Sequence, residues 1–147
     1  MAGLRLLETF LHASDSLAAR LGRSPARAEH LELGRKGEEA AYFYLRRQGY
    51  VVVARGWRSG KVRGDLDLVA WEGDTLCFIE VKSRSDRIGA TAEAAVDENK
   101  IRVLRRLARQ YMQAMSSPPA QVRFDVLSIY LHPQREFELI RAAFGWR

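Results

Sequence analysis

The chain has 147 residues, a net charge of +6, 47% hydrophobic residues and 29% charged residues. This length suits one ordinary domain with a real core, and the composition is that of a globular protein rather than a disordered chain. No apolar run is long enough to span a membrane, and the first eleven residues include Glu8 and lack the pattern of a secretory signal. We therefore expect a globular cytoplasmic protein with no membrane partner.

The single cysteine, Cys77, cannot form a disulfide within the chain. With only three histidines beside it, no zinc-ligand spacing can be assembled. A nucleophilic cysteine needs an exposed thiol and a positioned base, but Cys77 lies between Leu76 and Phe78 in an apolar run. The pattern therefore favours Cys77 as a small core residue.

The first thirty residues are predicted to form a helical appendage. Leucines recur at helical spacing from Leu4 to Leu21, and Ser24-Pro25 then breaks the pattern. No chemistry-bearing motif lies in this segment, so we expect it to pack on the domain or on a partner. The division predicted is an N-terminal appendage over residues 1–30 and an α/β domain over residues 31–147.

The rest of the chain predicts the order helix, three strands, helix, two strands. Hydrophobic periodicity and turn residues separate the elements, and an acid-Gly-acid sequence between two β-prone runs is a hairpin signal. The predicted elements are helices over 34–48 and 93–115 and strands over 50–54, 65–71, 75–82, 122–130 and 137–141. Three consecutive valines indicate that the first strand is buried.

The predicted hairpin places two acids on one face. If Trp71 and Leu76 are the last facing pair before the turn, antiparallel pairing sets Asp67 directly opposite Glu80. Side chains alternate between faces with period two, so Lys82 shares the face of these acids. The other face of the hairpin is wholly apolar and is predicted to carry Leu66, Leu68, Ala70, Cys77, Ile79 and Val81.

Two carboxylates directly opposite each other repel, at a cost of roughly 0.2–1 kcal/mol, unless a cation lies between them. Mg²⁺ accepts a few carboxylate oxygens and keeps water and phosphate oxygens in its remaining positions, which suits phosphodiester hydrolysis. Lys82 could hold the attacking water or neutralise charge on the phosphate. The alternative is an exposed strand face on which Lys82 simply pairs with an acid.

Basic residues are concentrated before the hairpin. Six of them and no acid occur between positions 46 and 63, namely Arg46, Arg47, Arg55, Arg58, Lys61 and Arg63. A basic patch of this kind fits a polyanion, and nucleic-acid contacts are predicted for Arg46, Arg47, Arg58, Lys61 and Arg63. A solvated charged loop explains the same pattern about equally well.

Three segments, taken in order, resemble the PD-(D/E)XK nuclease superfamily. They are Gly34-Arg35-Lys36-Gly37-Glu38 opening a helix, Gly64-Asp65-Leu66-Asp67-Leu68-Val69-Ala70, and Phe78-Ile79-Glu80-Val81-Lys82. More narrowly, the chain is similar to the YraN-like (UPF0102) family, which is related to archaeal Holliday-junction resolvases. The resemblance runs from about Gly34 to Phe144 and implies a restriction-endonuclease-like fold, a mixed central sheet flanked by helices.

The resemblance also implies roles for the matching positions. Asp67, Glu80 and the Val81 carbonyl would ligate Mg²⁺ or Mn²⁺, and Lys82 would position water or stabilise the transition state. Glu38 matches a helix-borne acid that reaches the metal shell, with Glu39 as the alternative and a plain helix N-terminal acid as the structural reading. Asp65 stands where the narrower family usually has glutamate.

Three functions of different classes remain open from the sequence. The first is a metal-dependent endonuclease acting on DNA, with branched or junction DNA implied by the resemblance. The second is a nucleic-acid-binding module that keeps the fold without catalysis, and the third is a scaffold that binds protein through its basic helix and N-terminal segment. The resolvase resemblance also implies a homodimer by analogy.

Overall fold

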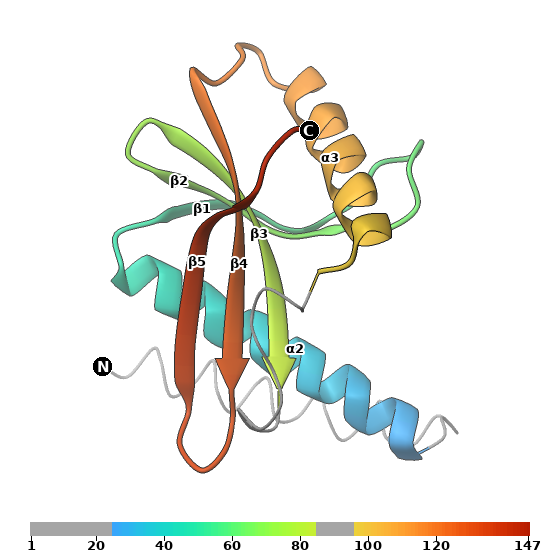
Figure 1. Ribbon diagram of the computed structural model, residues 1–147, viewed down its shortest axis with the longest axis vertical. Helices are drawn as coiled ribbons and strands as arrows, with labels where there is room; N and C mark the ends of the chain where they lie inside the picture. The colour runs from blue at the N-terminus through green and yellow to red at the C-terminus, as the bar shows by residue number, and fades with distance from the viewer. Residues whose placement is uncertain (1–24, 85–95) are drawn as a thin grey trace. The chain divides into compact units, whose positions relative to one another are not determined.

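The computed structural model describes residues 25–84 and 96–147. The chain divides after Leu33 into two compact units, and the second, Gly34–Arg147, carries every strand of the described residues. Figure 1 shows this unit as a central sheet with a helix before its first strand and another between its third and fourth. The helix predicted from Leu4 to Leu21 lies outside the described residues.

The sheet has five strands in the order β1-β2-β3-β4-β5. Only β3 and β4 are parallel, because α3 lies between them in the chain, and the other neighbours pair antiparallel. The strands are β1 (Val51–Trp57), β2 (Leu66–Glu72), β3 (Thr75–Arg84), β4 (Gln121–Tyr130) and β5 (Glu136–Phe144). The mixed sheet and the αβββαββ order predicted from the sequence are confirmed.

Both helices begin at residues other than those predicted. Helix α2 spans Pro25–Arg47 and so starts nine residues before the predicted Gly34, since a proline is well suited to the first turn of a helix. Helix α3 spans Glu98–Gln113, and Asp97 is its N-cap, accepting a hydrogen bond from the Lys100 amide at 2.8 Å. Residues 93–95 of the longer helix predicted there lie outside the described residues.

Side chains on the two faces of the sheet form separate cores, one against each helix. The α2-side core joins Ala40, Ala41 and Leu45 of α2 to Leu68, Ala70, Cys77 and Ile79 of the hairpin. The α3-side core joins Leu104, Leu107 and Ala108 of α3 to Val69, Leu76 and Phe78. The predicted alternation is therefore confirmed for the paired part of the hairpin, from Leu68 to Ile79, and helices cover both faces.

Leu66 and Cys77 show how far the sequence prediction of the hairpin faces holds. Leu66 was expected on the same face as Leu68 but belongs to the α3-side core. Leu66 lies outside the paired part of the hairpin, because the pairing of β2 with β3 begins only at Leu68, opposite Ile79. Cys77 is fully buried, as predicted, and burial raises the pKa of its thiol to about 11. A thiol of this kind is a poor nucleophile.

Strand β1 is not the buried strand that its valines predicted. It lies at one edge of the sheet, and the side chains of Val51 and Val53 are 62% and 47% exposed. Val52 faces the α2-side core, and Tyr50, just before the strand, is 3% exposed. Ala54 and Trp57 pack against the α3-side core, so β1 contacts both cores, and the valines that reach solvent are Val51 at the start of the edge strand and Val53 at the β-bulge between Val52 and Ala54.

A charged network holds the ends of β2, β4 and β5 together. Hydrogen bonds from Arg141 and Arg123 lower the pKa of Glu72 to about 2, against some desolvation. Arg123 also donates two hydrogen bonds, of 2.7 and 2.9 Å, to the carboxylate of the fully buried Asp125. The Ala142 amide donates to the same carboxylate at 3.0 Å. Asp125 is therefore a buried acid whose charge is fully compensated.

Candidate active site

The hairpin register sets the geometry of the site. Trp71 pairs with Leu76, as predicted, but Glu72 and Thr75 form one further pair before the turn. The turn is therefore the two residues Gly73 and Asp74, with Gly73 in the left-handed region at φ 56°. The extra pair leaves the predicted register unchanged, and the last pair that the two strands form is Leu68 with Ile79, one residue before Asp67 of β2 and Glu80 of β3 would face each other.

Asp67 lies one residue beyond the last backbone pair of β2 and β3, which joins Leu68 to Ile79. Its Oδ2 accepts a hydrogen bond of 2.8 Å from the Val81 amide, so a side chain replaces the backbone acceptor that a continued ladder would supply. The residue is 9% exposed. The hydrogen bond fixes the carboxylate against β3 and beside Glu80. The role predicted for the Val81 carbonyl remains a prediction.

Glu80 is the more deeply buried acid, at 3% exposure. Its Oε1 lies 3.1 Å from Lys82 Nζ and 3.2 Å from Lys100 Nζ. Its Oε2 is buried and has no hydrogen-bond partner. The alternative predicted from the sequence was an exposed strand face on which Lys82 pairs with an acid. The ion pair between Lys82 and Glu80 is present, but the acids on that face are buried. A buried carboxylate oxygen without a partner is costly and is a place where a cation would be stabilised.

Lys100 is a functional candidate that the sequence analysis missed. It lies in the first turn of α3, and the Asp97 cap fixes the backbone there. Burial lowers the pKa of Lys100, but Glu80 and Asp67 together outweigh it, so the net pKa is raised and the side chain is charged. The capping pattern Asp97-Glu98-Asn99-Lys100 is the signal that could have placed this lysine at the start of the helix.

Glu38 approaches the site from α2. Gly37 permits this approach, because a Cβ at that position would lie 1.6 Å from the Ser83 Oγ of β3. Burial raises the pKa of Glu38; Asp65 and Glu80 raise it further, while Arg55 and Lys100 lower it. The structure thus brings the predicted Glu38 into the same electrostatic environment as Glu80.

The acid pair carries an electrostatic strain of its own. Burial and the neighbouring Glu80 raise the pKa of Asp67 to about 8, against the stabilising hydrogen bond from Val81. Ionising both carboxylates is therefore unfavourable unless positive charge is supplied. Lys82 and Lys100 supply it on one side of Glu80, and the Oε2 side is left for another cation.

The donor set fits a hard divalent cation rather than zinc. Within residues 25–84 and 96–147 no group of three or more His, Cys, Asp or Glu side chains could hold one ion, so a closed protein cage is absent from this part of the chain. Mg²⁺ commonly takes one or two carboxylates and completes its octahedron with water and phosphate oxygens. Asp67 and Glu80, with the partnerless Oε2, could supply these two carboxylates.

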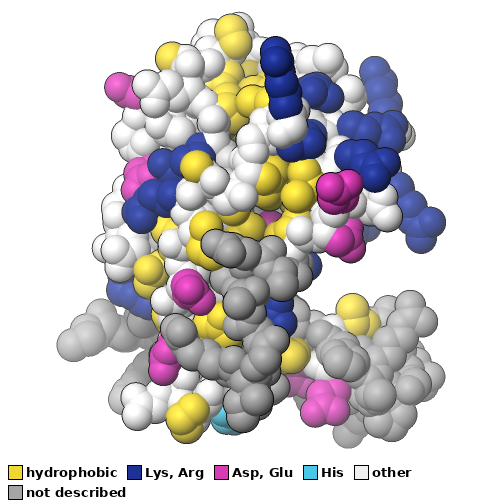
Figure 2. All heavy atoms as spheres, in the orientation of Figure 1, with side chains coloured by type: hydrophobic (Ala, Val, Ile, Leu, Met, Phe, Trp, Pro, Cys, Tyr) yellow, Lys and Arg dark blue, Asp and Glu magenta, His cyan; other side chains and the backbone are white. Residues whose placement is uncertain are grey.

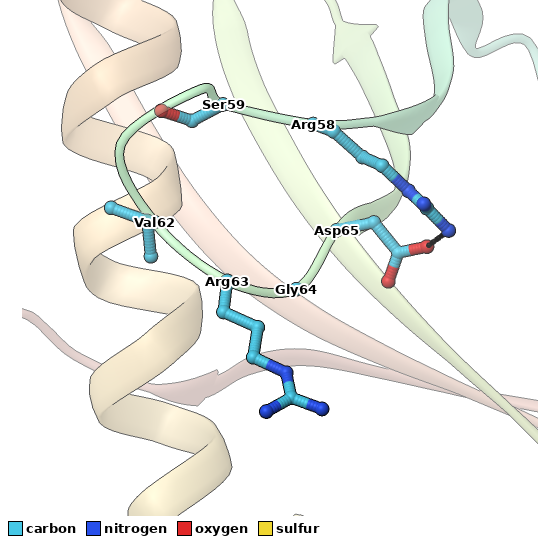
Figure 3. Close-up of a pocket in the computed structure, with 6 residues that line it drawn as sticks. All are labelled: Arg58, Ser59, Val62, Arg63, Gly64 and Asp65. Atoms are coloured by element: carbon cyan, nitrogen blue, oxygen red, sulfur yellow. Dashed lines mark ion pairs between the residues drawn. The ribbon is translucent and has the colours of Figure 1, made fainter.

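The predicted nucleic-acid-binding residues lie in two different places. Arg58, Lys61 and Arg63 are exposed in the loop between β1 and β2, where Arg58 pairs with Asp65 at 3.6 Å. Figure 3 shows this loop curving beside a helix, around a pocket of about 410 Å³. Arg46 and Arg47 instead end α2, the helix that packs on the opposite face from α3.

Comparison with known proteins adds the family to this geometry. Residues 37–129 match the sequence profile described as uncharacterised protein family UPF0102. A UPF0102 protein of Koribacter versatilis is 48% identical over 82% of this chain and 84% of its own length. The chain belongs to the UPF0102 family. Another UPF0102 protein, from Solibacter usitatus, is 43% identical over 76% of the chain and 84% of its own length.

The matched region contains every residue of the candidate site, from Gly37 and Glu38 through the Asp67–Glu80 hairpin to Lys100. A UPF0102 protein of Rhodococcus opacus is 40% identical over 80% of this chain and 99% of its own length. The YraN-like identification made from three short segments is therefore confirmed. Neither helix in the described parts of the chain is long and apolar enough to cross a membrane.

Proposed function

We propose that this UPF0102 protein is a divalent-metal-dependent endonuclease that hydrolyses phosphodiester bonds in DNA. The observation that carries the proposal is the buried pair Asp67 and Glu80, in which Glu80 Oε2 has no hydrogen-bond partner. Mg²⁺ or Mn²⁺ held by these carboxylates would supply Lewis-acid polarisation of the phosphate and an activated water. The order of helix acid, aspartate strand and Glu-x-Lys strand supports this chemistry by resemblance.

The two lysines have distinct parts in this proposal. Both ammonium groups lie within 3.2 Å of Glu80 Oε1, so they orient that carboxylate. Lys82 follows Glu80 on the same strand face and is 33% exposed, so its ammonium can turn toward a phosphate as negative charge develops. Lys100 is anchored on a capped helix and serves to position Glu80.

A second function is favoured by the same ion pairs. Two ammonium groups on one carboxylate compensate its charge without any metal, which is what a non-catalytic nucleic-acid-binding protein of this fold would need. The two functions differ over the buried Glu80 Oε2, which has no hydrogen-bond partner beside Asp67, because a metal ion would satisfy this oxygen and binding alone does not require it. The nuclease proposal is therefore the better supported of the two.

The test is a cleavage screen on duplex, single-stranded and four-way-junction DNA, with Mg²⁺, with Mn²⁺ and with EDTA. The wild-type protein should cleave at least one substrate only when a divalent ion is present, and Asp67→Asn should abolish cleavage. Asp125→Gln is unsuitable as a control because Asp125 is structural; Asp74→Asn, in the exposed hairpin turn, removes an acid away from the site. Equal cleavage by wild type and Asp67→Asn would reject the assignment, as would binding without cleavage under every ion.

Junction DNA and a homodimer belong to this proposal through the resolvase resemblance alone. A symmetric dimer would place two such sites on one branched substrate. Sedimentation equilibrium of the full chain, with and without a four-way junction, measures the oligomeric state directly.

A further inference from the structure

The positive charge of the chain is concentrated in two segments. Helix α3 and the loop over residues 58–65 hold eight of the 24 basic residues but only two of the 18 acidic ones, so the rest of the chain has sixteen of each sign. The whole net charge of +6 therefore resides in these two segments. Their basic residues are Arg58, Lys61, Arg63, Lys100, Arg102, Arg105, Arg106 and Arg109.

These two segments are in contact with each other. A Cβ at Gly64 would lie 3.1 Å from the Val103 Cγ1 of α3, and Val62 packs into the α3-side core. Gly64 has φ 114°, which lets the loop turn back against the helix. Figure 2 shows Lys and Arg side chains gathered over this region, at the upper right of the view. The loop and α3 thus form one basic surface, which we call the loop–α3 surface.

The loop–α3 surface adjoins the candidate active site at both of its segments. Lys100, in the first turn of α3, reaches Glu80 Oε1 at 3.2 Å. Asp65, at the end of the loop, is close enough to raise the pKa of Glu38 and that of Lys100. The acids therefore lie at the border of the basic surface.

Three arginines give this surface a regular spacing. Arg102, Arg106 and Arg109 are exposed at i, i+4 and i+7 of α3, and so share one face of the helix. At a rise of 1.5 Å per residue they span about 10 Å. One DNA strand presents a phosphate about every 3.4 Å along the helix axis, so a stripe of this length can meet roughly three phosphates.

The surroundings of this surface restrict its ligand. Among the described residues the exposed large hydrophobic side chains are Leu31, Val51 and Val53, all outside the loop and α3. A membrane-inserting surface needs such side chains at its centre. Within residues 25–84 and 96–147 every Phe, Tyr and Trp side chain is at least partly buried, whereas proteins that bind single strands stack bases on exposed aromatic rings.

We infer that the loop–α3 surface is the binding track for the phosphate backbone of a nucleic-acid duplex, delivering that backbone to the acids at its border. The inference deepens the proposed nuclease function and rests on it for the orientation of the substrate. It assigns phosphate contacts to Arg102 and Arg106, which the sequence pattern did not single out. It also places Arg46 and Arg47 outside the track, because α2 packs on the other face of the sheet.

The test is fluorescence anisotropy with a labelled 30-base-pair DNA duplex, in EDTA so that no cleavage occurs, at several salt concentrations. Arg102→Gln/Arg106→Gln should weaken binding about tenfold or more and lower the slope of log K against log salt by about two, since each lost phosphate contact removes roughly 0.9. Arg46→Gln/Arg47→Gln removes the same total charge from α2 and should leave the slope within experimental error of wild type.

A second pair tests the loop half of the surface. Lys61→Gln/Arg63→Gln, both at exposed positions, should lower the slope by a similar amount. Circular dichroism melting of every variant checks that the fold is retained. In two further experiments an unlabelled single strand, or vesicles containing anionic phospholipid, is added as a competitor of the labelled duplex.

Three outcomes overturn the inference: equal slopes for the α3 and α2 pairs, tighter binding of the single strand than of the duplex, or binding of vesicles but not of duplex. These outcomes are independent of cleavage. Duplex binding through the loop–α3 surface by a protein that never cleaves would reject the proposed nuclease function and leave the track intact. If the protein cleaves DNA and Arg102→Gln/Arg106→Gln binds the duplex as wild type does, the binding track is rejected and the nuclease proposal stands.

Discussion

Replacing Asp67 with asparagine should stabilise the metal-free protein. The folded state raises the pKa of this carboxyl from 3.8 to about 8, so its contribution to stability is fully present below pH 3.8 and is lost as the pH rises toward 8. Between pH 3.8 and pH 7 the folded state loses at most on the order of 4 kcal/mol of stability through this carboxyl. Asparagine removes the charge, keeps an oxygen for the Val81 amide, and should recover about 1–3 kcal/mol.

The assay is urea unfolding of wild type and Asp67→Asn in EDTA at pH 7 and again at pH 4.5. The gain should be largest at pH 7 and should shrink at pH 4.5, where the wild-type carboxyl is protonated. Asp125→Asn is the matched control, because Asp125 is also buried but is held by Arg123 and by the Ala142 amide. It should instead lose about 1–3 kcal/mol, since a neutral amide replaces the buried carboxylate that accepts from Arg123 and from the Ala142 amide, although Arg123 keeps its ion pair with Glu72.

Saturating Mn²⁺ should reverse the order of the two proteins. A ligand that binds only the folded state stabilises it by RT ln(1 + [L]/Kd), so wild type should gain about 3 kcal/mol at a hundredfold excess over Kd. Asp67→Asn should gain far less. The reasoning would be refuted if Asp67→Asn were destabilised at pH 7 to the same degree as Asp125→Asn.

Three further substitutions test separate parts of the account. Lys82→Met should lower the cleavage rate about a hundredfold with little change in duplex affinity, because Lys82 donates to the transition state. Lys100→Met should lower the cleavage rate and also weaken Mn²⁺ binding, because Lys100 positions Glu80. Single-turnover kinetics measures the cleavage rates, and calorimetry measures Mn²⁺ binding. Gly37→Ala should destabilise the fold by about 1–3 kcal/mol in thermal melts through its clash with Ser83, and Gly34→Ala, with open space around it, should not. Glu72→Gln should remove about 1 kcal/mol at pH 7, after allowance for its partial exposure, and less as the pH falls from 4.5 toward 2, where the wild-type carboxyl is protonated. Equal urea midpoints for Glu72→Gln and wild type at pH 7 would contradict the last of these.

Much of the fold could be predicted because its signals are local. Alternating side chains fixed the faces of the hairpin, and the acid-Gly-acid turn fixed its register. The burial of β1 could not be predicted, because strand order is a tertiary property and three valines fit an edge strand as well as a central one. The start of α2 was missed because Pro25 was taken as a break, although proline also begins helices.

The candidate site divides in the same way. Asp67 and Glu80 lie on neighbouring antiparallel strands, each one residue beyond the last pair Leu68 and Ile79, and Asp67 accepts from the Val81 amide beside Glu80, so strand register accounts for most of their placement. Lys100 is twenty residues from Glu80 and meets it only because α3 packs on the acid-bearing face. The basic residues between positions 46 and 63 form one run in the chain but lie on different elements, and no sequence pattern reports which face of the sheet each element covers.

The central claim is that Asp67 and Glu80 form a divalent-metal site. It is tested most directly by crystals of the full chain soaked in Mn²⁺ and measured at the manganese absorption edge. The account predicts an anomalous peak within about 2.0–2.4 Å of a carboxylate oxygen from each acid, with Glu80 Oε2 among its ligands. It also predicts that the peak disappears in Asp67→Asn. No peak at this position at saturating Mn²⁺, with Lys82 and Lys100 still on Glu80, would contradict the account.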